Sequence, residues 1–183
     1  MERYLMTHSL LSAWLYAMRG NPREDTTTER DPMEDFMRTL RRVPTPPTDA
    51  MKAGIDFEHM VMNLCAGIPA MRFEGGAEPV VIADCPWYDA AAKVADVVRG
   101  GSFQHRATKE INVGGVKYLL YGRLDALKAG VIYDIKFSSH YERGKFEAST
   151  QHPVYMELLP EARTFTYLVS NGRDVWRETS GSL

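Results

Sequence analysis

Apolar residues in the first third of the chain recur at three- and four-residue intervals, which is the spacing of an amphipathic helix. The spacing predicts three helices, over about 7–18, 31–42 and 48–65. Residues of N-cap type stand at their starts: Thr7, Asp31 and either Thr48 or Asp49. The polar stretch 21–30 predicts a loop between the first two helices.

The second helix has an apolar side and a clear end. Its predicted buried face consists of Met33, Phe36, Met37 and Leu40. The prolines of segment 44–47 end it, because proline lacks a backbone donor and restricts the residue before it.

The rest of the chain reads mainly as strands separated by glycine turns. We expect strands at about 79–83, 103–113, 116–127, 131–137, 164–169 and 175–178, and helices at about 88–98 and 150–159. Hairpin turns are expected at Gly114-Gly115, Ala129-Gly130 and Asn171-Gly172. The order predicts one α/β (α+β) domain over 1–183, with a helical N-terminal part at 1–70 and a sheet core at 78–178.

Composition narrows the classes of function. The 183 residues suffice for a buried core, and 22 Lys and Arg against 24 Asp and Glu leave a net charge of −2. Nucleic acid would therefore need a local basic patch. Two cysteines are too few for a disulfide framework and favour a reducing, cytoplasmic compartment. No apolar run reaches the roughly 18 residues of a membrane span, and stretch 10–18 favours an amphipathic helix over a signal peptide.

Three charged residues around the predicted 129–130 turn carry the candidate chemistry. Asp134 and Lys136 share one face of a strand, because side chains alternate. If the turn is centred between Ala129 and Gly130, Asp125 opposes Asp134 with the Cβ atoms about 5 Å apart. Two carboxylates at this separation repel each other. A bound hard divalent cation would remove this repulsion. An Asp-x-Lys motif by itself is usually only a solvated ion pair, so further residues must support a site.

Four short motifs supply that support. Gly54-x-x-x-Glu58, Gly122-Arg123-Leu124-Asp125, Asp134-Ile135-Lys136 and Gln151-x-x-x-Tyr155 follow one another in this order. Together they resemble the PD-(D/E)XK nuclease superfamily, and in particular its RecB-like exonuclease branch. The resemblance spans nearly the whole chain and implies a restriction-endonuclease-like core, in which helices flank a central mixed sheet.

The resemblance assigns roles around a metal ion. It implies that Asp125, Asp134 and the backbone carbonyl of Ile135 ligate Mg²⁺ or Mn²⁺. Lys136 would position the attacking water and stabilise developing negative charge. Glu58 takes the remaining acidic position, with His59 as the second candidate for it; the two point about 100° apart on a helix, so one of them is expected to face the metal.

Further residues would meet the nucleic acid. The resemblance implies that Gln151 and Tyr155, on one face of a helix, contact the strand or the active site. The candidates for phosphate contact are basic: Arg99, Arg106, Lys109, Arg123, His140, Arg143 and Lys145. The aromatic residues Tyr141 and Phe146 could stack on bases.

The chain departs from the family pattern in two respects. Leu124 stands where the superfamily's name-giving proline is expected. Relatives with an iron–sulfur cluster carry four cysteines, and this chain has two, so we expect no such cluster. No P-loop motif accompanies the nuclease-like motifs, which argues against a helicase motor in this chain.

The implied function is a Mg²⁺- or Mn²⁺-dependent deoxyribonuclease that hydrolyses DNA phosphodiester bonds, favoured as an exonuclease over an endonuclease. The implied setting is DNA recombination, repair or phage DNA processing, with DNA and a recombinase, helicase or single-strand-binding protein as partners. Two alternatives stay open: a non-catalytic nucleic-acid-binding module that retains the fold, and a metal-dependent hydrolase of a small substrate. The oligomeric state also stays open.

Overall fold

The computed structural model describes residues 3–19 and 31–181, and the predicted loop at 21–30 lies outside the described residues. The chain forms two compact units, and each is interrupted in sequence. The first comprises Met1–Pro46, Ala107–Gly122 and Ser149–Leu158. The second comprises Pro47–Arg106, Arg123–Ala148 and Leu159–Leu183.

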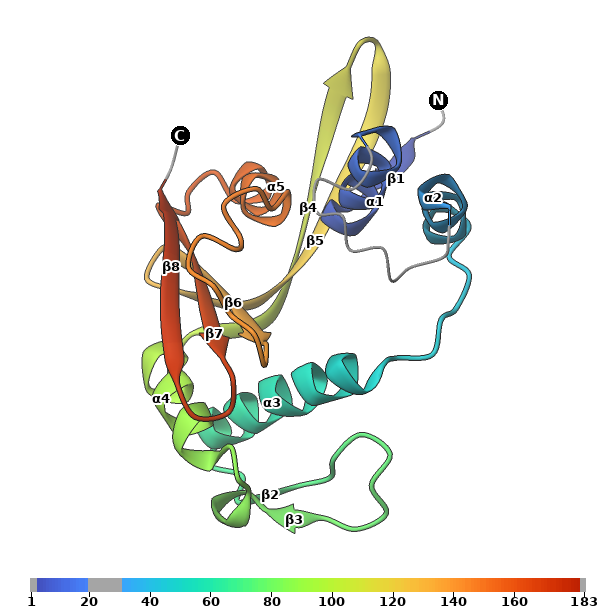
Figure 1. The fold of residues 1–183 in the computed structure, drawn as a ribbon. Coiled ribbons are helices and arrows are strands. Elements are labelled where there is room, and N and C mark those ends of the chain that lie inside the picture. The colour runs from blue at the N-terminus through green and yellow to red at the C-terminus, as the bar shows by residue number, and fades with distance from the viewer. Residues whose placement is uncertain (1–2, 20–30, 182–183) are drawn as a thin grey trace. The chain divides into compact units, whose positions relative to one another are not determined.

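The first unit is built from elements in three separate stretches of the chain. Its elements are β1 (Tyr4–Met6), α1 (His8–Arg19), α2 (Pro32–Leu40), α5 (Gln151–Leu158) and the turn end of the hairpin formed by β4 (Ser102–Val113) and β5 (Val116–Lys128). Strand β1 pairs in parallel with β5, with Tyr4 opposite Tyr118. Helix α1 packs against α2 (Figure 1) and also contacts α5.

The predicted caps of α1 and α2 are confirmed. Oγ1 of Thr7 accepts the backbone N–H of Leu10 at 3.2 Å, and Oδ1 of Asp31 accepts that of Met33 at 3.0 Å. The predicted buried face of α2 is wrong in part, since Met33 and Leu40 are 42% and 47% exposed. Within this unit α2 packs mainly against α1, which covers only part of its apolar side.

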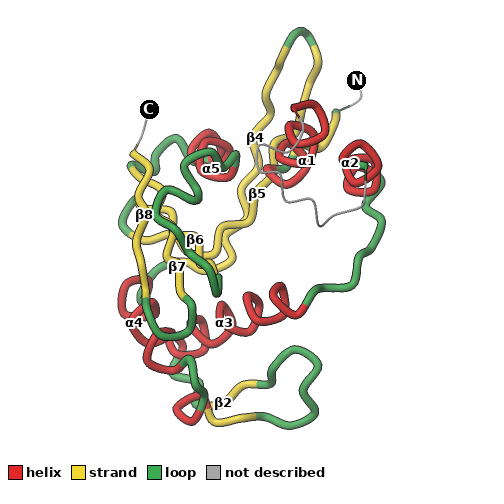
Figure 2. The backbone as a smooth tube through the Cα atoms, viewed as in Figure 1, coloured by secondary structure: helices red, strands yellow, loops and turns green. Residues whose placement is uncertain are grey.

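The second unit combines a mixed sheet with helices. Its helices are α3 (Asp49–Ala66), α4 (Tyr88–Val98) and the 3-10 turn η1 (Ile82–Asp84). Its mixed sheet contains β6 (Val131–Phe137), β7 (Thr164–Ser170), β8 (Val175–Gly181) and the adjoining ends of β4 and β5, while β2 (Ala70–Met71) and β3 (Val80–Val81) form a separate two-stranded antiparallel sheet. Strands β5 and β6 are antiparallel, β6 and β7 parallel, and β7 and β8 antiparallel. Figure 2 draws these strands in yellow. A mixed sheet flanked by helices confirms the predicted α+β class.

The core of this unit lies where α3 and α4 pack together and α3 meets β6. Phe57 and Met60 of α3 are fully buried, and the ring of Phe57 lies 5.2 Å from that of Phe137 on β6. Helix α4 contributes three alanines to the core, whose small side chains permit close approach: Ala90, Ala91 and Ala95. The core therefore holds α3 on the strand that carries Asp134 and Lys136.

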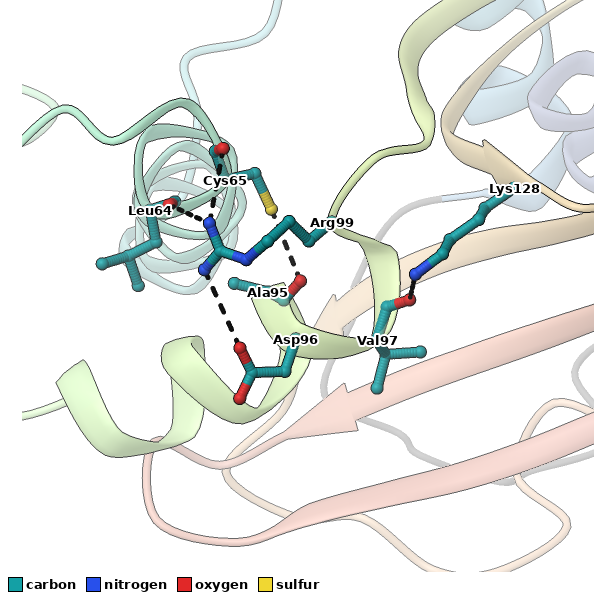
Figure 3. A network of polar contacts seen from close by, with 7 residues as sticks. All are labelled: Leu64, Cys65, Ala95, Asp96, Val97, Arg99 and Lys128. Atoms are coloured by element: carbon teal, nitrogen blue, oxygen red, sulfur yellow. Dashed lines mark hydrogen bonds and ion pairs between the residues drawn. The ribbon is translucent and has the colours of Figure 1, made fainter.

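Polar contacts also fix the C-terminal end of α3 (Figure 3). Nη1 of Arg99 donates to the carbonyl oxygens of Leu64 at 2.9 Å and Cys65 at 3.4 Å. Terminal helix carbonyls have no partner within the helix, so these bonds satisfy them. Nζ of Lys128, at the end of β5, donates to the carbonyl of Val97 at 2.7 Å and ties the hairpin to α4. Within the described ranges, no helix is both long and apolar enough to span a membrane.

Candidate functional site

The β5–β6 hairpin has the predicted register. Ala126 pairs with Tyr133, and the turn residues Ala129 and Gly130 have φ values of 50° and 76°. Two successive residues with positive φ form the tight turn that suits twisted strands, and glycine at the second position adopts this φ without strain. One further residue in the same register would bring Asp125 opposite Asp134.

Asp125 binds the neighbouring strand through its side chain. The backbone N–H of Ile135 donates to Oδ2 of Asp125 at 2.8 Å. Backbone pairing between β5 and β6 ends at Ala126 and Tyr133. The carboxylate of Asp125 thus lies at the point where the backbone ladder ends, directed at the backbone between Asp134 and Lys136.

Strand alternation separates the charged from the apolar side chains of β6. Nζ of Lys136 lies 2.8 Å from Oδ2 of Asp134, whose side chain is 2% exposed. Ile135 and Phe137 belong to the opposite face and pack in the core with Phe57. The predicted division of this strand into a charged face and a core face is confirmed.

Glu58 joins this group from α3. It lies one residue after the buried Phe57 and is half-buried itself. Nε2 of Gln104, on β4, donates to Oε1 of Glu58. We call this group the acid cluster. It consists of the three carboxylates of Glu58, Asp125 and Asp134 and the ammonium of Lys136, which pairs with Asp134.

The pKa values of the cluster show that its charges interact. Burial raises the pKa of Asp125 well above its ordinary value, and the charges of Asp134 and Glu58 add to the rise, while the Ile135 N–H and Lys136 oppose it. Burial likewise raises the pKa of Glu58; the charges of His59 and Arg123 oppose this rise, and Asp134 adds to it. Carboxylates confined together in a poorly hydrated site disfavour their charged forms.

Lys136 responds in the opposite direction. Burial by itself lowers its pKa, but the charge and hydrogen bond of Asp134, followed by the charges of Asp125 and Glu58, raise it above its ordinary value. The side chain is therefore an ammonium group at neutral pH. It can stabilise negative charge but cannot accept a proton.

The cluster has the donor chemistry of a hard-cation site. Its carboxylate oxygens are the ligands that Mg²⁺ prefers, and a cation would relieve their repulsion. Among residues 3–19 and 31–181, no three His, Cys, Asp or Glu side chains form a ready-made metal group. Magnesium usually needs only one or two carboxylates and keeps several waters, so Asp125 and Asp134 suffice for such an ion.

His59 faces a different place. It lines an open hollow of about 190 Å³ together with Met62, Asn63, Met71 and Arg72. The charge of Glu58, by contrast, raises the pKa values of Asp125 and Lys136, and the charge of Asp134 raises the pKa of Glu58. Of the two neighbours on α3, Glu58 is the one that joins the acid cluster.

The basic residues predicted from sequence differ in their availability. Arg123 is exposed, and its charge lowers the pKa of Glu58, which places it near the acid cluster. Arg143 is exposed in the loop after β6. Nζ of Lys145 instead donates to Ser138 and to the carbonyl of His140, at 3.2 and 3.1 Å.

Two other candidates for phosphate contact have structural partners. Arg99 donates to the end of α3, as described above. Lys109, in the first unit, lies 2.6 Å from Oε1 of Glu157. Arg106, Arg123, His140 and Arg143, the other basic candidates outside Lys145, all have exposed side chains.

The loop after β6 is anchored by stacked rings. Phe146 stacks on Tyr167 with centroids 4.7 Å apart, and Tyr141 lies 5.1 Å from Trp176. Glu178 of β8 accepts the hydroxyl of Tyr141 at 2.8 Å and the backbone N–H of Phe146 at 3.2 Å. Phe146 thus uses its ring within the protein, contrary to the base-stacking role expected from sequence.

Gln151 and Tyr155 belong to the first unit, whereas the acid cluster belongs to the second. Both are buried, at 6% and 5% exposure, and Tyr155 meets His8 edge to face with centroids 5.6 Å apart. Gly122 permits this packing, because a Cβ there would lie 2.7 Å from atoms of Tyr155 and Leu158. Within their unit these residues hold α5 against β5.

Sequence reasoning missed Gln104 and Glu178. Gln104 stands in an ordinary strand-like run, and Glu178 near the end of the last strand. Neither belongs to a motif, so no local signal marks them. Only the packing of β4 beside α3, and of the loop beside β8, shows their roles.

Comparisons with known proteins support the fold and leave the function open. No family model matches the chain, and no curated protein matches it. A solved structure titled "Crystal structure of SSO0001" is similar over 100% of this chain and 69% of that chain, with 15% sequence identity and a TM-score of 0.51. At this identity the likeness shows the fold alone, a mixed α/β arrangement.

Proposed function

We propose that the chain is a metal-dependent deoxyribonuclease with the restriction-endonuclease-like core of the PD-(D/E)XK superfamily, related to RecB-like exonucleases. The observation that carries the proposal is the juxtaposition of Asp125, Asp134 and Lys136 at the β5–β6 hairpin. The charge of Glu58, on α3, raises the pKa of Asp125, which supports the inclusion of Glu58 in the proposed site. Two adjacent strands and one helix distant in sequence thus contribute to the proposed site.

The residues of the cluster have distinct tasks in phosphodiester hydrolysis. A Mg²⁺ or Mn²⁺ ion held by Asp125, Asp134, Glu58 and the carbonyl of Ile135 would supply Lewis-acid activation of water and phosphate. The Ile135 N–H fixes the orientation of Asp125. Lys136, kept protonated by its acidic neighbours, donates to the attacking water and stabilises charge developing on the phosphate.

The charge distribution suits DNA only when a cation is bound. The acid cluster alone repels phosphate, and the chain has a net charge of −2. Arg123, close to the cluster, and exposed Arg143 are the groups we assign to phosphate contact. The proposed setting is cytoplasmic DNA recombination, repair or phage DNA processing, with a recombinase, helicase or single-strand-binding protein as the partner class.

The test is a cleavage assay with Mg²⁺ and with Mn²⁺ on linear and on closed circular DNA. We expect the parent to degrade linear DNA, and Asp134→Asn to stay folded and lose activity. Asp49→Asn is the matched control, because it removes a carboxylate that pairs with Lys52 on the exposed side of α3. Cleavage by Asp134→Asn at the parental rate would reject the assignment. Cleavage of closed circular DNA would show that the activity is that of an endonuclease rather than an exonuclease.

A non-catalytic nucleic-acid-binding module is the second candidate. It is favoured by the ion pair between Asp134 and Lys136, because this pair offsets the buried charge of Asp134 in part without a metal. Such a module binds DNA and cuts none with either ion. A protein that binds Mn²⁺ but neither binds nor cuts DNA would instead indicate a hydrolase of a small substrate.

A further inference from the structure

Gln104 has an unusual backbone for a residue inside a strand. Its φ is 52°, and it is one of three non-glycine residues with positive φ in the described part of the chain. The other two, Arg42 and Ala129, lie in turns. A side chain in this conformation crowds the next carbonyl and costs free energy. It persists where the surrounding structure imposes it, and such positions gather at functional sites.

This backbone conformation accompanies a side-chain contact between Gln104 and α3. Its Nε2 donates to Oε1 of Glu58, which joins β4 to α3. Glu58 is half-buried and close to the charge of Asp134. Without a donor, repulsion would favour turning the Glu58 carboxylate away from the other acids. An amide opposes this movement without adding a positive charge that would compete with a metal ion.

We propose that Gln104 is a positioning residue that holds the Glu58 carboxylate in the acid cluster, ready to ligate a divalent cation, an inference that rests on the proposed function. The strained backbone at Gln104 aims the amide, and the core packing of Phe57 fixes the helix that carries its acceptor. Gln104 contacts neither water nor phosphate in this role. It acts through Glu58.

Three variants separate positioning from a purely structural role. Gln104→Met keeps the length of the side chain and removes the donor. Gln104→Gly removes the donor and also relieves the positive φ. Ala129→Gly relieves a positive φ of 50° in the β5–β6 turn, away from Glu58, and is the matched control for backbone effects.

The measurement is calorimetric titration of each metal-free protein with Mn²⁺ alone, together with its thermal unfolding midpoint. We expect Gln104→Met and Gln104→Gly to bind Mn²⁺ about 10-fold more weakly than the parent, which is typical for loss of a residue that orients a ligand. Ala129→Gly should bind as the parent does. Gln104→Gly should unfold at no lower a temperature than Gln104→Met, which shows that weaker binding does not reflect unfolding.

The outcomes distinguish this inference from the proposed function. A parent that binds Mn²⁺, with Gln104→Met and Gln104→Gly binding as tightly, overturns the positioning role alone. Equal weakening in Ala129→Gly also overturns it, because backbone strain would then account for the effect. A parent without affinity for Mn²⁺ overturns the proposed function itself, whatever the variants do.

Discussion

Nζ of Lys136 lies 2.8 Å from Oδ2 of Asp134, two residues earlier on the same strand. The two side chains meet because alternate residues of a strand share a face. Their exposed fractions are 32% and 2%, so this ion pair is largely shielded from water. The pair between Lys52 and Asp49 on α3 has the same charges, but its aspartate is fully exposed. This shielding strengthens the electrostatic interaction of the first pair relative to the second.

Lys136→Met is expected to abolish nuclease activity and to weaken the fold. Loss of the ammonium should reduce the cleavage rate by at least about 100-fold, the scale for removing one donor to developing charge. It also leaves the buried Asp134 without this partner, at a cost of about 3 kcal/mol in the free energy of unfolding. Cleavage assays and urea unfolding of the metal-free protein measure the two effects.

Lys52→Met is the control for this change, because it breaks the exposed ion pair. We expect a change of less than about 1 kcal/mol and parental cleavage. Cleavage by Lys136→Met at the parental rate would show that the lysine has no part in the chemistry.

Asp125→Asn is expected to stabilise the metal-free protein at neutral pH while removing metal-dependent activity. Burial, followed by the charges of Asp134 and Glu58, raises the pKa of Asp125. A raised pKa in the folded state means that the stabilisation from this group is complete below its ordinary pKa of about 3.9, and is lost as the pH rises through the folded-state value. Asparagine stays neutral, and its amide oxygen can still accept the Ile135 N–H.

Urea unfolding from about pH 5 to about pH 8 tests this linkage. The stability of Asp125→Asn relative to the parent should increase with pH, and saturating Mg²⁺ should stabilise the parent more than the variant. A difference between the two proteins that stays constant over this range would contradict the raised pKa.

Gly122→Ala is expected to destabilise the first unit. The added Cβ would lie 2.7 Å from atoms of Leu158 and Tyr155, so α5 must move. Overpacking of this kind costs about 1–3 kcal/mol. Thermal unfolding should show the loss, accompanied by a change in the near-ultraviolet signal of tyrosine.

Gly54→Ala is expected to have the opposite effect and to stabilise the protein. A Cβ at Gly54, inside α3, would meet no atom within 4 Å. Alanine in a helix is then favoured over glycine by about 0.5–1 kcal/mol. A stabilising Gly122→Ala, or a strongly destabilising Gly54→Ala, would contradict the packing described for these two positions.

Glu178→Ala is expected to release the loop after β6. The change removes the acceptor of both the Tyr141 hydroxyl and the Phe146 N–H, which should cost about 1–2 kcal/mol. Burial, together with the hydrogen bond and charge of Glu178, raises the pKa of Tyr141 to about 12, and the variant should lower it. Faster tryptic cleavage after Arg143 would report the released loop.

Glu142→Ala is a suitable control, because Glu142 is an exposed carboxylate of the same loop. It should be cleaved at the parental rate. Equal protease sensitivity of parent and Glu178→Ala would show that the stacked rings alone hold the loop.

Local sequence signals predicted most of the elements. Helix α4 and strand β6 begin and end at the predicted residues, and α3 ends one residue beyond its prediction. The predicted strand at 79–83 is shorter, and its second half forms a 3-10 turn at Ile82–Asp84. Strands β1 and β2, of three and two residues, were missed because such short segments show no periodicity.

Contacts between segments that are distant in sequence were harder to predict than the elements themselves. Strand β1 exists through pairing with residues more than a hundred positions later, such as Tyr4 with Tyr118. The apolar side of α2 predicted burial, yet Met33 and Leu40 are exposed. Periodicity shows which residues share a face, but the amount of surface that covers the face depends on the packing partner.

The sequence by itself determined the charged hairpin. The residues Ala129-Gly130 set a two-residue turn, and the alternation of β6 put Asp134 and Lys136 on one face, because turn chemistry and strand period are local properties. The tertiary structure decided that Gln104 donates to Glu58, that His59 lines an open hollow, and that Phe146 stacks on Tyr167. These outcomes depend on which surfaces meet after the chain has folded, and no local pattern encodes that.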